Sequence, residues 1–286
     1  MTALRYATHI GFAGPDDRPQ FLETLGTAEP AAHVRFAAQE GMAGVLFPWV
    51  IDKSPLEREA VRRALVETGI GFSCVASLPF DVTASPIWTD RSTRNRSALA
   101  AAIVDSSNIA ISLGSTLLAV VVAADAARPD TARQSDDLVA NLRDVALIAQ
   151  DQGLTLGIEP MVRMQSSLLR TTAAAVDVIE AVDQPNVGLI YDTTHVSMMD
   201  GDLLAVLAEH FEHIVSLQLS NEPGRVEPGA GILPLVDVAV EAVRRGYTGL
   251  VDLEHGWLRP TKSGEQAGLA RVRAFDSRVR DALLSQ

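Results

Sequence analysis

The chain is poor in cysteine. Its 286 residues include one cysteine, Cys74, so no disulfide can form within the chain, and this is typical of a protein from a reducing cytosol. Cys74 lies inside the apolar run IGFSCVASL, which predicts a buried core residue rather than a reactive thiol. We therefore expect a cytoplasmic protein.

Long hydrophobic segments are also missing. The N-terminal residues MTALRYATHIGF lack the apolar stretch of a secretory signal peptide. The longest apolar run, 117–124, is far shorter than the ~20 residues that a membrane-spanning helix needs. These features predict a soluble protein with no membrane partner.

Basic residues are outnumbered. The chain has 24 lysines and arginines against 36 acidic residues, which gives a formal net charge of −12. A field of that sign repels phosphate backbones and anionic membranes, so nucleic acid is not an expected partner. A small anionic substrate is not excluded, because local arginine and histidine side chains can override the global charge.

What the sequence does contain is an alternation of short apolar runs with helical segments. The predicted strands are 5–12, 43–49, 70–80 (with its exit loop), 115–123, 154–160, 186–192, 213–220 and 249–255. The predicted helices are 30–41, 54–69, 89–113, 131–153, 171–182, 201–210, 234–245 and 264–284. This alternation is typical of parallel strands joined by right-handed crossovers.

Eight such units close naturally into a ring. No glycine-rich phosphate fingerprint follows the first predicted strand, which counts against a dinucleotide-binding sheet. No break in composition divides the chain, and about 250 residues is the usual length of an α/β barrel. The sequence predicts a single (β/α)8 TIM barrel domain over residues 1–286. Barrels of this kind often associate through their outer helices, so a homo-oligomer is compatible with this fold.

Polar side chains end the last four predicted strands. They are Glu159, Asp192, Gln218 and Glu254. The active site of such a barrel lies at the C-terminal ends of its strands, and neighbouring strands let these side chains converge. Three carboxylates in one place repel one another unless a cation neutralises them, and oxygen ligands favour Mg²⁺ or Mn²⁺ over zinc.

Each of the four has a plainer interpretation. Glu159 before a proline is often a loop residue or a helix cap, and Asp192 could cap the next turn. Gln218 could be a hydrogen-bonded polar residue inside the barrel, and Glu254 could pair with an arginine. The same pattern at four consecutive strand ends is hard to obtain by chance, so we favour a shared metal site.

His195 lies three residues after Asp192 in the predicted loop DTTH. It could be a metal ligand, or it could donate to a substrate oxygen. Arg225 lies in the glycine- and proline-rich loop NEPGRVEPGAG, where a guanidinium suits bidentate capture of a carboxylate or of paired hydroxyls. Glu227 in the same loop is expected to orient Arg225. Four residues near the ends of other predicted strands could wall the pocket: His9, Phe12, Trp49 and Trp257.

Several motifs together carry a family resemblance. IEP, YDTTHVSMMDGDL, HIVSLQLSNEPGRVEPGAG and GYTGLVDLEH resemble the xylose-isomerase-like barrel superfamily of sugar isomerases and epimerases, and hydroxypyruvate isomerases most of all. The likeness is strong over 154–254 and diffuse before it. Ile232 stands where that family often has an acidic residue, which leaves the substrate open.

The resemblance implies a site and a reaction. Glu159, Asp192, Gln218 and Glu254 would hold a divalent metal, Mn²⁺ or Mg²⁺. Glu159 and Glu254 would double as the acid/base pair. His195 and Arg225 would contact the substrate. The implied activity is isomerisation or epimerisation of a small hydroxy-carbonyl compound, hydroxypyruvate- or ketose-like, through an enediolate.

Other functions stay open at this point. A lyase or dehydratase of the same superfamily would use the same enolate to expel a β-hydroxyl from a keto-cyclitol or keto-sugar. A DNA-repair endonuclease needs a histidine-rich zinc cluster and a basic groove, and six histidines with a net charge of −12 argue against it. A sugar-binding barrel without turnover is opposed only by the presence of Glu159 and Glu254.

Overall fold

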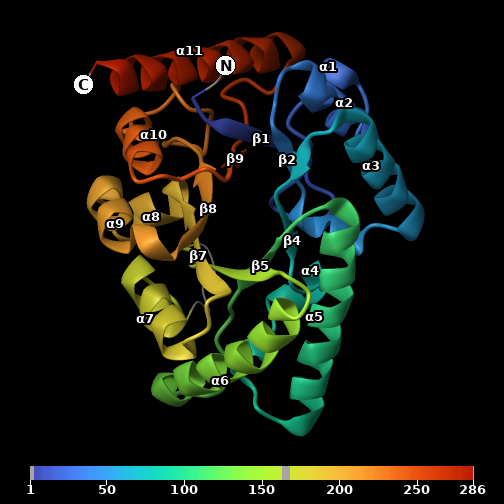
Figure 1. Cartoon of the computed structure of the whole chain (residues 1–286), viewed down its shortest axis with the longest axis vertical. Helices are drawn as coiled ribbons and strands as arrows, with labels where there is room; N and C mark the ends of the chain where they lie inside the picture. The colour runs from blue at the N-terminus through green and yellow to red at the C-terminus, as the bar shows by residue number, and fades with distance from the viewer. Residues whose placement is uncertain (1–2, 163–167, 286) are drawn as a thin grey trace.

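Nine short strands form one sheet in which every pairing between strands is parallel (Figure 1). The computed structural model describes residues 3–162 and 168–285. The strands are β1 (Arg5–His9), β2 (Gly44–Leu46), β3 (Gly71–Phe72), β4 (Cys74–Ala76), β5 (Leu117–Val121), β6 (Thr155–Glu159), β7 (Val187–Asp192), β8 (Ile214–Leu219) and β9 (Leu250–Leu253). Their order in the sheet is β3-β2-β1-β9-β8-β7-β6-β5-β4.

The two ends of this order are consecutive in the chain. Only Ser73 separates β3 from β4, and its backbone N–H donates to the Val45 carbonyl at 2.9 Å. β3 and β4 are therefore two halves of one barrel strand, which pairs with β2 through its first half and with β5 through its second. The predicted eight-stranded (β/α)8 barrel is confirmed.

Helices cover the outside of the sheet (Figure 1). The α-helices are α1 (Leu22–Leu25), α2 (Pro30–Gln39), α3 (Pro55–Thr68), α4 (Phe80–Thr83), α5 (Thr93–Leu113), α6 (Thr131–Gln150), α7 (Thr172–Val182), α8 (Thr193–Met199), α9 (Leu203–His210), α10 (Leu235–Arg244) and α11 (Lys262–Leu284). Three 3-10 turns, η1 (Pro48–Asp52), η2 (Pro86–Thr89) and η3 (Phe211–His213), complete the described elements.

Local sequence explains where these helices begin. Ser54 and Glu57 form a capping box at the start of α3, and Pro55 occupies its first turn. Helix α8 begins where the sequence predicts a loop. Asp192 accounts for this difference, because its Oδ1 accepts hydrogen bonds from the N–H groups of Thr194 and His195 and so caps a helix.

The core has two parts because strand side chains alternate between the two faces of the sheet. Leu118 and Val120 of β5 belong to the large cluster between strands and helices. Leu117 and Ala119 belong with Cys74 to a small cluster of the opposite face, which is the interior of the barrel. Cys74 is buried as expected, and burial raises the pKa of its thiol well above the ordinary range.

Within residues 3–162 and 168–285, none of the helices combines the length and the apolar character that crossing a bilayer requires.

Candidate active site

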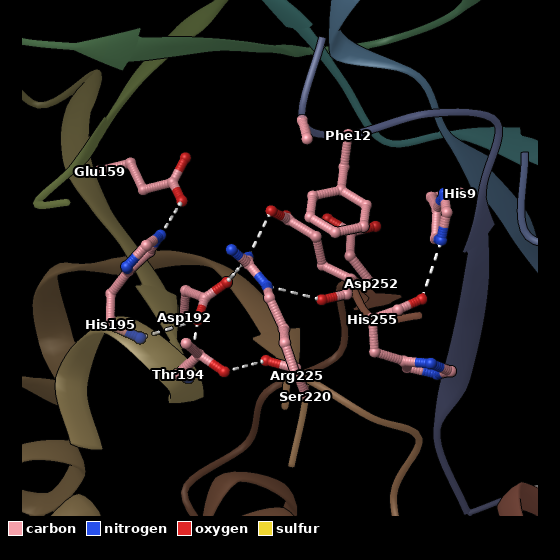
Figure 2. A network of polar contacts seen from close by, with 12 residues as sticks. His9, Phe12, Glu159, Asp192, Thr194, His195, Ser220, Arg225, Asp252 and His255 are labelled. Carbon is pink, nitrogen blue, oxygen red and sulfur yellow. Dashed lines mark hydrogen bonds and ion pairs between the residues drawn. The ribbon is translucent and has the colours of Figure 1, made fainter. Parts of the chain in front are cut away.

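The four predicted strand-end residues meet at one end of the barrel, and Figure 2 shows Glu159 and Asp192 there beside His195 and Arg225. Glu159 and Asp192 are the last residues of β6 and β7, and Glu254 directly follows β9. Gln218 of β8 lies in register with Asp192. All four side chains are buried, with exposed fractions between 1% and 8%. Glu159, Gln218 and Glu254 line the same cavity of about 360 Å³, which Arg225 and His195 also line.

Arg225 ties two of these carboxylates together. Its Nη2 lies 2.6 Å from Asp192 Oδ2 and 2.6 Å from Glu254 Oε1, and its Nε donates to the Glu254 carbonyl at 3.0 Å. The backbone of Arg225 has a φ of 52°, a left-handed conformation that is uncommon outside glycine. The guanidinium also lies over the ring of Phe12, 4.7 Å from its centroid. The loop thus places a positive charge where charges of the opposite sign converge.

His195 faces Glu159. Its Nε2 is 3.6 Å from Glu159 Oε1, and its Nδ1 accepts a hydrogen bond of 3.4 Å from the Val162 N–H. A ring nitrogen that accepts in a neutral imidazole leaves the other nitrogen to carry the proton, so Nε2–H points toward Glu159. His195 thus lies beside Glu159, just beyond hydrogen-bond distance.

Burial changes the proton affinity of the two glutamates. Burial and, to a smaller extent, the Asp192 charge raise the pKa of Glu159 to about 8, although Arg225 lowers it. Burial likewise raises the pKa of Glu254 well above its usual range, although Arg225 lowers it. Glu159 can consequently hold or release a proton near neutral pH, and the raised pKa of Glu254 favours its protonated, acidic form.

The donor set suits a hard divalent cation. Glu159, Asp192 and His195 each offer one ligand atom, and these three atoms lie within 4.8 Å of one another. Glu159 Oε1 and Gln218 Oε1 are buried and have no hydrogen-bond partner in the described part of the chain. Buried polar atoms without partners are costly, and a bound cation would satisfy both oxygens. This group contains two of the four predicted ligands, Glu159 and Asp192, together with His195, which was expected either as a ligand or as a substrate contact.

Asp192 does not itself line the cavity but contacts it through its ion pair with Arg225, and two other predicted site residues, His9 and Glu227, also lie away from the lining. His9 is buried behind Phe12, and its ring contacts the His255 carbonyl at 2.9 Å and the Gly11 N–H at 3.2 Å. Burial lowers the pKa of His9 to about 4. Glu227 does not contact Arg225 as expected. Its carboxylate binds Arg271 of α11 and accepts from the Leu258 N–H at 2.8 Å, so it anchors the loop to the last helix.

Trp49 does line the cavity, as does Phe12, whereas Trp257 packs outside it. Sequence reasoning missed Asp252, a fully buried carboxylate that accepts from Ser73 Oγ at 2.7 Å and from Ser216 Oγ at 3.4 Å. The signal was present, because Asp252 lies two residues before Glu254 and so shares its face of β9.

The fold and the site define a class of protein: a parallel α/β barrel whose strand ends gather carboxylates suited to a cation. The chain belongs to the xylose isomerase-like TIM barrel family, whose pattern matches residues 34–275. It is 30% identical to a putative hydroxypyruvate isomerase of Streptomyces coelicolor, across 82% of this chain and 87% of that protein.

Two further similarities bear on the range of chemistry in this superfamily. A 3-dehydroshikimate dehydratase of Pseudomonas aeruginosa is 30% identical over 61% of this chain, a match that covers 29% of that longer protein. The structure of an E. coli 3-keto-D-glucoside 4-epimerase superposes with a TM-score of 0.74 at 17% identity, covering 95% of this chain and 99% of that one. At this identity the superposition shows a shared fold. Relatives by sequence are thus named a putative hydroxypyruvate isomerase, a D-psicose 3-epimerase of Ruminiclostridium cellulolyticum (28% identical over 41% of this chain and 39% of that protein) and a dehydratase.

Proposed function

We propose that the protein is a divalent-metal-dependent isomerase or epimerase that acts on a small hydroxy-carbonyl compound through an enediolate, with Glu159 and Glu254 as the acid/base pair. One observation carries the proposal: two buried glutamates with raised pKa values line the same cavity beside a third carboxylate and an arginine. The names of the relatives support the reaction class.

The cation would be held by the oxygen atoms of Glu159, Asp192, Gln218 and Glu254; His195 lies next to Glu159 and could ligate through Nε2 only in the tautomer without a proton there. Oxygen-rich ligand sets favour Mg²⁺ or Mn²⁺. When bound, such an ion supplies Lewis-acid polarisation of the carbonyl and stabilises the negative charge of the enediolate.

The chain's own residues account for the proton transfers. One glutamate takes the proton from the hydroxyl-bearing carbon next to the carbonyl, and the other, as a glutamic acid, returns a proton. Return to the former carbonyl carbon, with transfer of the hydroxyl proton to the former carbonyl oxygen, gives isomerisation. Return to the opposite face of the original carbon gives epimerisation. His195, beside Glu159 in the cavity wall, would donate to a substrate oxygen, and the Arg225 guanidinium would supply donors to another once its carboxylate partners are otherwise neutralised.

Solvent proton exchange tests this proposal. The full chain with Mn²⁺ or Mg²⁺ is incubated in D2O with hydroxypyruvate, dihydroxyacetone and a panel of ketoses, and deuterium incorporation is followed by NMR. We expect exchange that a chelator abolishes. Metal binding without exchange in any compound would contradict the proposal and support a non-catalytic barrel.

The similarity to a dehydratase makes a lyase the second candidate. The same enolate would expel a β-hydroxyl, so the NMR spectra would show a dehydrated product from a keto-cyclitol or keto-sugar. Exchange without loss of water assigns the isomerase or epimerase reaction instead.

A further inference from the structure

The cavity has two chemically different walls. The charged and amide residues come from the second half of the barrel, β6 to β9 and the loops after them. The first half of the chain contributes a wall that is almost entirely apolar: Phe12, Pro48, Trp49, Ala76, Leu78, Phe80, Ala119 and Val121. No charged side chain among the described residues of this half lines the cavity.

The polar atoms of the apolar wall are largely committed to the protein. The indole N–H of Trp49 donates to the Phe12 carbonyl at 2.6 Å, so Trp49 presents only its ring to the cavity. The hydroxyl of Thr83 donates to the Pro79 carbonyl at 3.1 Å. Ser77 contributes the other hydroxyl of this wall, and that side chain is 2% exposed. A polyhydroxylated substrate would therefore find few partners here.

Aromatic rings form the outer edge of the same wall. The rings of Trp49 and Phe80 meet edge to face, with centroids 4.9 Å apart. Phe80 begins α4, lines the cavity and is 44% exposed, so its ring lies between the cavity and solvent. An exposed phenylalanine at the mouth of a cavity is available to cover an apolar group that enters it.

We propose that the natural substrate is a hydroxy-carbonyl compound that carries an apolar, ring-sized substituent, which packs against Trp49, Phe80 and Val121. The proposal rests on the proposed function for the reacting end of the substrate, which faces Glu159 and Glu254. The alternative is a sugar substrate, whose unbranched polyhydroxylated tail would occupy the same part of the cavity.

Size and desolvation both point to this class. A three-carbon compound would leave most of a 360 Å³ cavity unfilled, whereas pockets from about 300 Å³ upward suit larger ligands. A hydroxyl placed against this wall loses its water without gaining a partner, while an apolar group there gains from leaving water. The two effects act in the same direction, so discrimination between the two tails should be large.

The test uses three compounds with the same reacting end: dihydroxyacetone, its benzyl-substituted derivative, and fructose, in which a trihydroxypropyl tail replaces the benzyl group. Each keeps a hydroxyl on both sides of the carbonyl, so proton exchange at either neighbouring carbon is detectable. With saturating Mn²⁺, kcat/KM for solvent exchange, expressed per concentration of open-chain ketone because fructose is mostly cyclic, should favour the benzyl compound over fructose by roughly tenfold to a hundredfold. Equal values, or a preference for fructose, would overturn this inference and leave the proposed function standing.

Two variants check the wall itself. Phe80→Ser changes a partly exposed rim residue, and Phe80→Leu is its apolar control. Val121→Asn places an amide at the end of β5, inside the cavity. Phe80→Ser and Val121→Asn should each narrow the ratio between the benzyl compound and fructose by about tenfold. Phe80→Leu should keep most of the ratio, and an unchanged ratio in all three variants would refute the role of the wall.

Binding measurements test the apolar wall independently of the proposed reaction. Isothermal titration calorimetry with the same compounds needs no turnover. If no compound exchanges protons, the proposed reaction fails, but tighter binding of the benzyl compound that Phe80→Ser weakens would still support the apolar subsite. Binding that does not distinguish the two tails would refute it.

Discussion

Arg225 occupies the position of a counterion. Its Nη2 binds the Asp192 and Glu254 oxygens that are also expected to hold a divalent cation. Two positive charges cannot share those oxygens without repulsion, so Arg225 and the cation should compete. Arg225 is then free to turn toward the substrate only when the cation has replaced it.

Removing this guanidinium should strengthen metal binding. We expect Arg225→Met to lower the Kd for Mn²⁺ about tenfold or more, because charge-assisted hydrogen bonds worth roughly 1.5–3 kcal/mol no longer oppose the ion. Isothermal titration calorimetry at fixed ionic strength measures this directly. Arg273→Met, which removes an exposed arginine outside the site, is the control for net charge. A weaker or equal Kd in Arg225→Met would show that Arg225 does not compete.

Each glutamate of the pair should be indispensable for turnover. Glu159→Gln or Glu254→Gln keeps the size of the side chain but cannot exchange a proton. At saturating metal, kcat should fall by about 10²–10⁴-fold while the thermal unfolding midpoint stays close to that of the parent protein. Glu212→Gln, an exposed change, should leave kcat unaltered. Retained activity in both site variants would exclude the two-glutamate mechanism.

The positions of the site residues were predictable, but their contacts were not. Glu159, Asp192 and Glu254 could be located because each ends a short apolar run, and the ends of parallel strands share one edge. The ion pairs of Arg225 depend on the path of a loop with a left-handed residue, which no local pattern reveals. Glu227 binds Arg271, 44 positions later on α11, so its partner also could not be found from sequence spacing.

Strand β7 ends at Asp192, and its pairing with β8 requires the two strands to approach closely. A Cβ added to Gly188 of β7 would lie 2.7 Å from the His213 carbonyl and 2.3 Å from Val215 Cγ1. The absence of a side chain at Gly188 therefore lets the two strands approach. The sequence pattern located β7 but gave no indication that one of its glycines was required for packing.

Gly188→Ala should destabilise the barrel by roughly 1–3 kcal/mol, because the backbone at His213, in the 3-10 turn η3 before β8, must move to admit a methyl group. Denaturant unfolding measures the change. Gly153→Ala separates this clash from loss of glycine itself, since a Cβ at Gly153 meets no neighbour within 4 Å and only its φ of 71° is strained. If Gly188→Ala unfolds at the denaturant concentration of the parent protein, β7 and β8 have more room than the structure shows.

Asp252 of β9 connects distant strands of the barrel through hydrogen bonds in the interior. Its Oδ2 binds Ser73, at the break between β3 and β4, and Ser216 of β8, so one carboxyl links three strands across the interior. Burial raises the pKa of Asp252 from 3.8 to about 7, although the two serine hydrogen bonds lower it. The folded barrel therefore holds this proton more tightly than the unfolded chain does.

The sign of the resulting pH dependence follows from that difference. The folded state binds more protons than the unfolded state between pH 4 and 7, so the contribution of Asp252 to stability is fully present below about pH 4 and is lost as the pH rises through 7. From pH 5 to pH 8 the loss should reach roughly 2–3 kcal/mol, at about 1.4 kcal/mol per pKa unit. Asp252→Asn cannot ionise and still accepts from Ser73, so this part of the slope should disappear. Thermal unfolding of both proteins with a chelator present, at pH 5 and pH 8, measures the difference. The Asp252 charge also raises the pKa values of Glu159 and Glu254, so its removal should reduce their part of the slope in the same direction. Parallel pH profiles would mean that Asp252 is already ionised inside the folded barrel, with an unseen partner on its Oδ1.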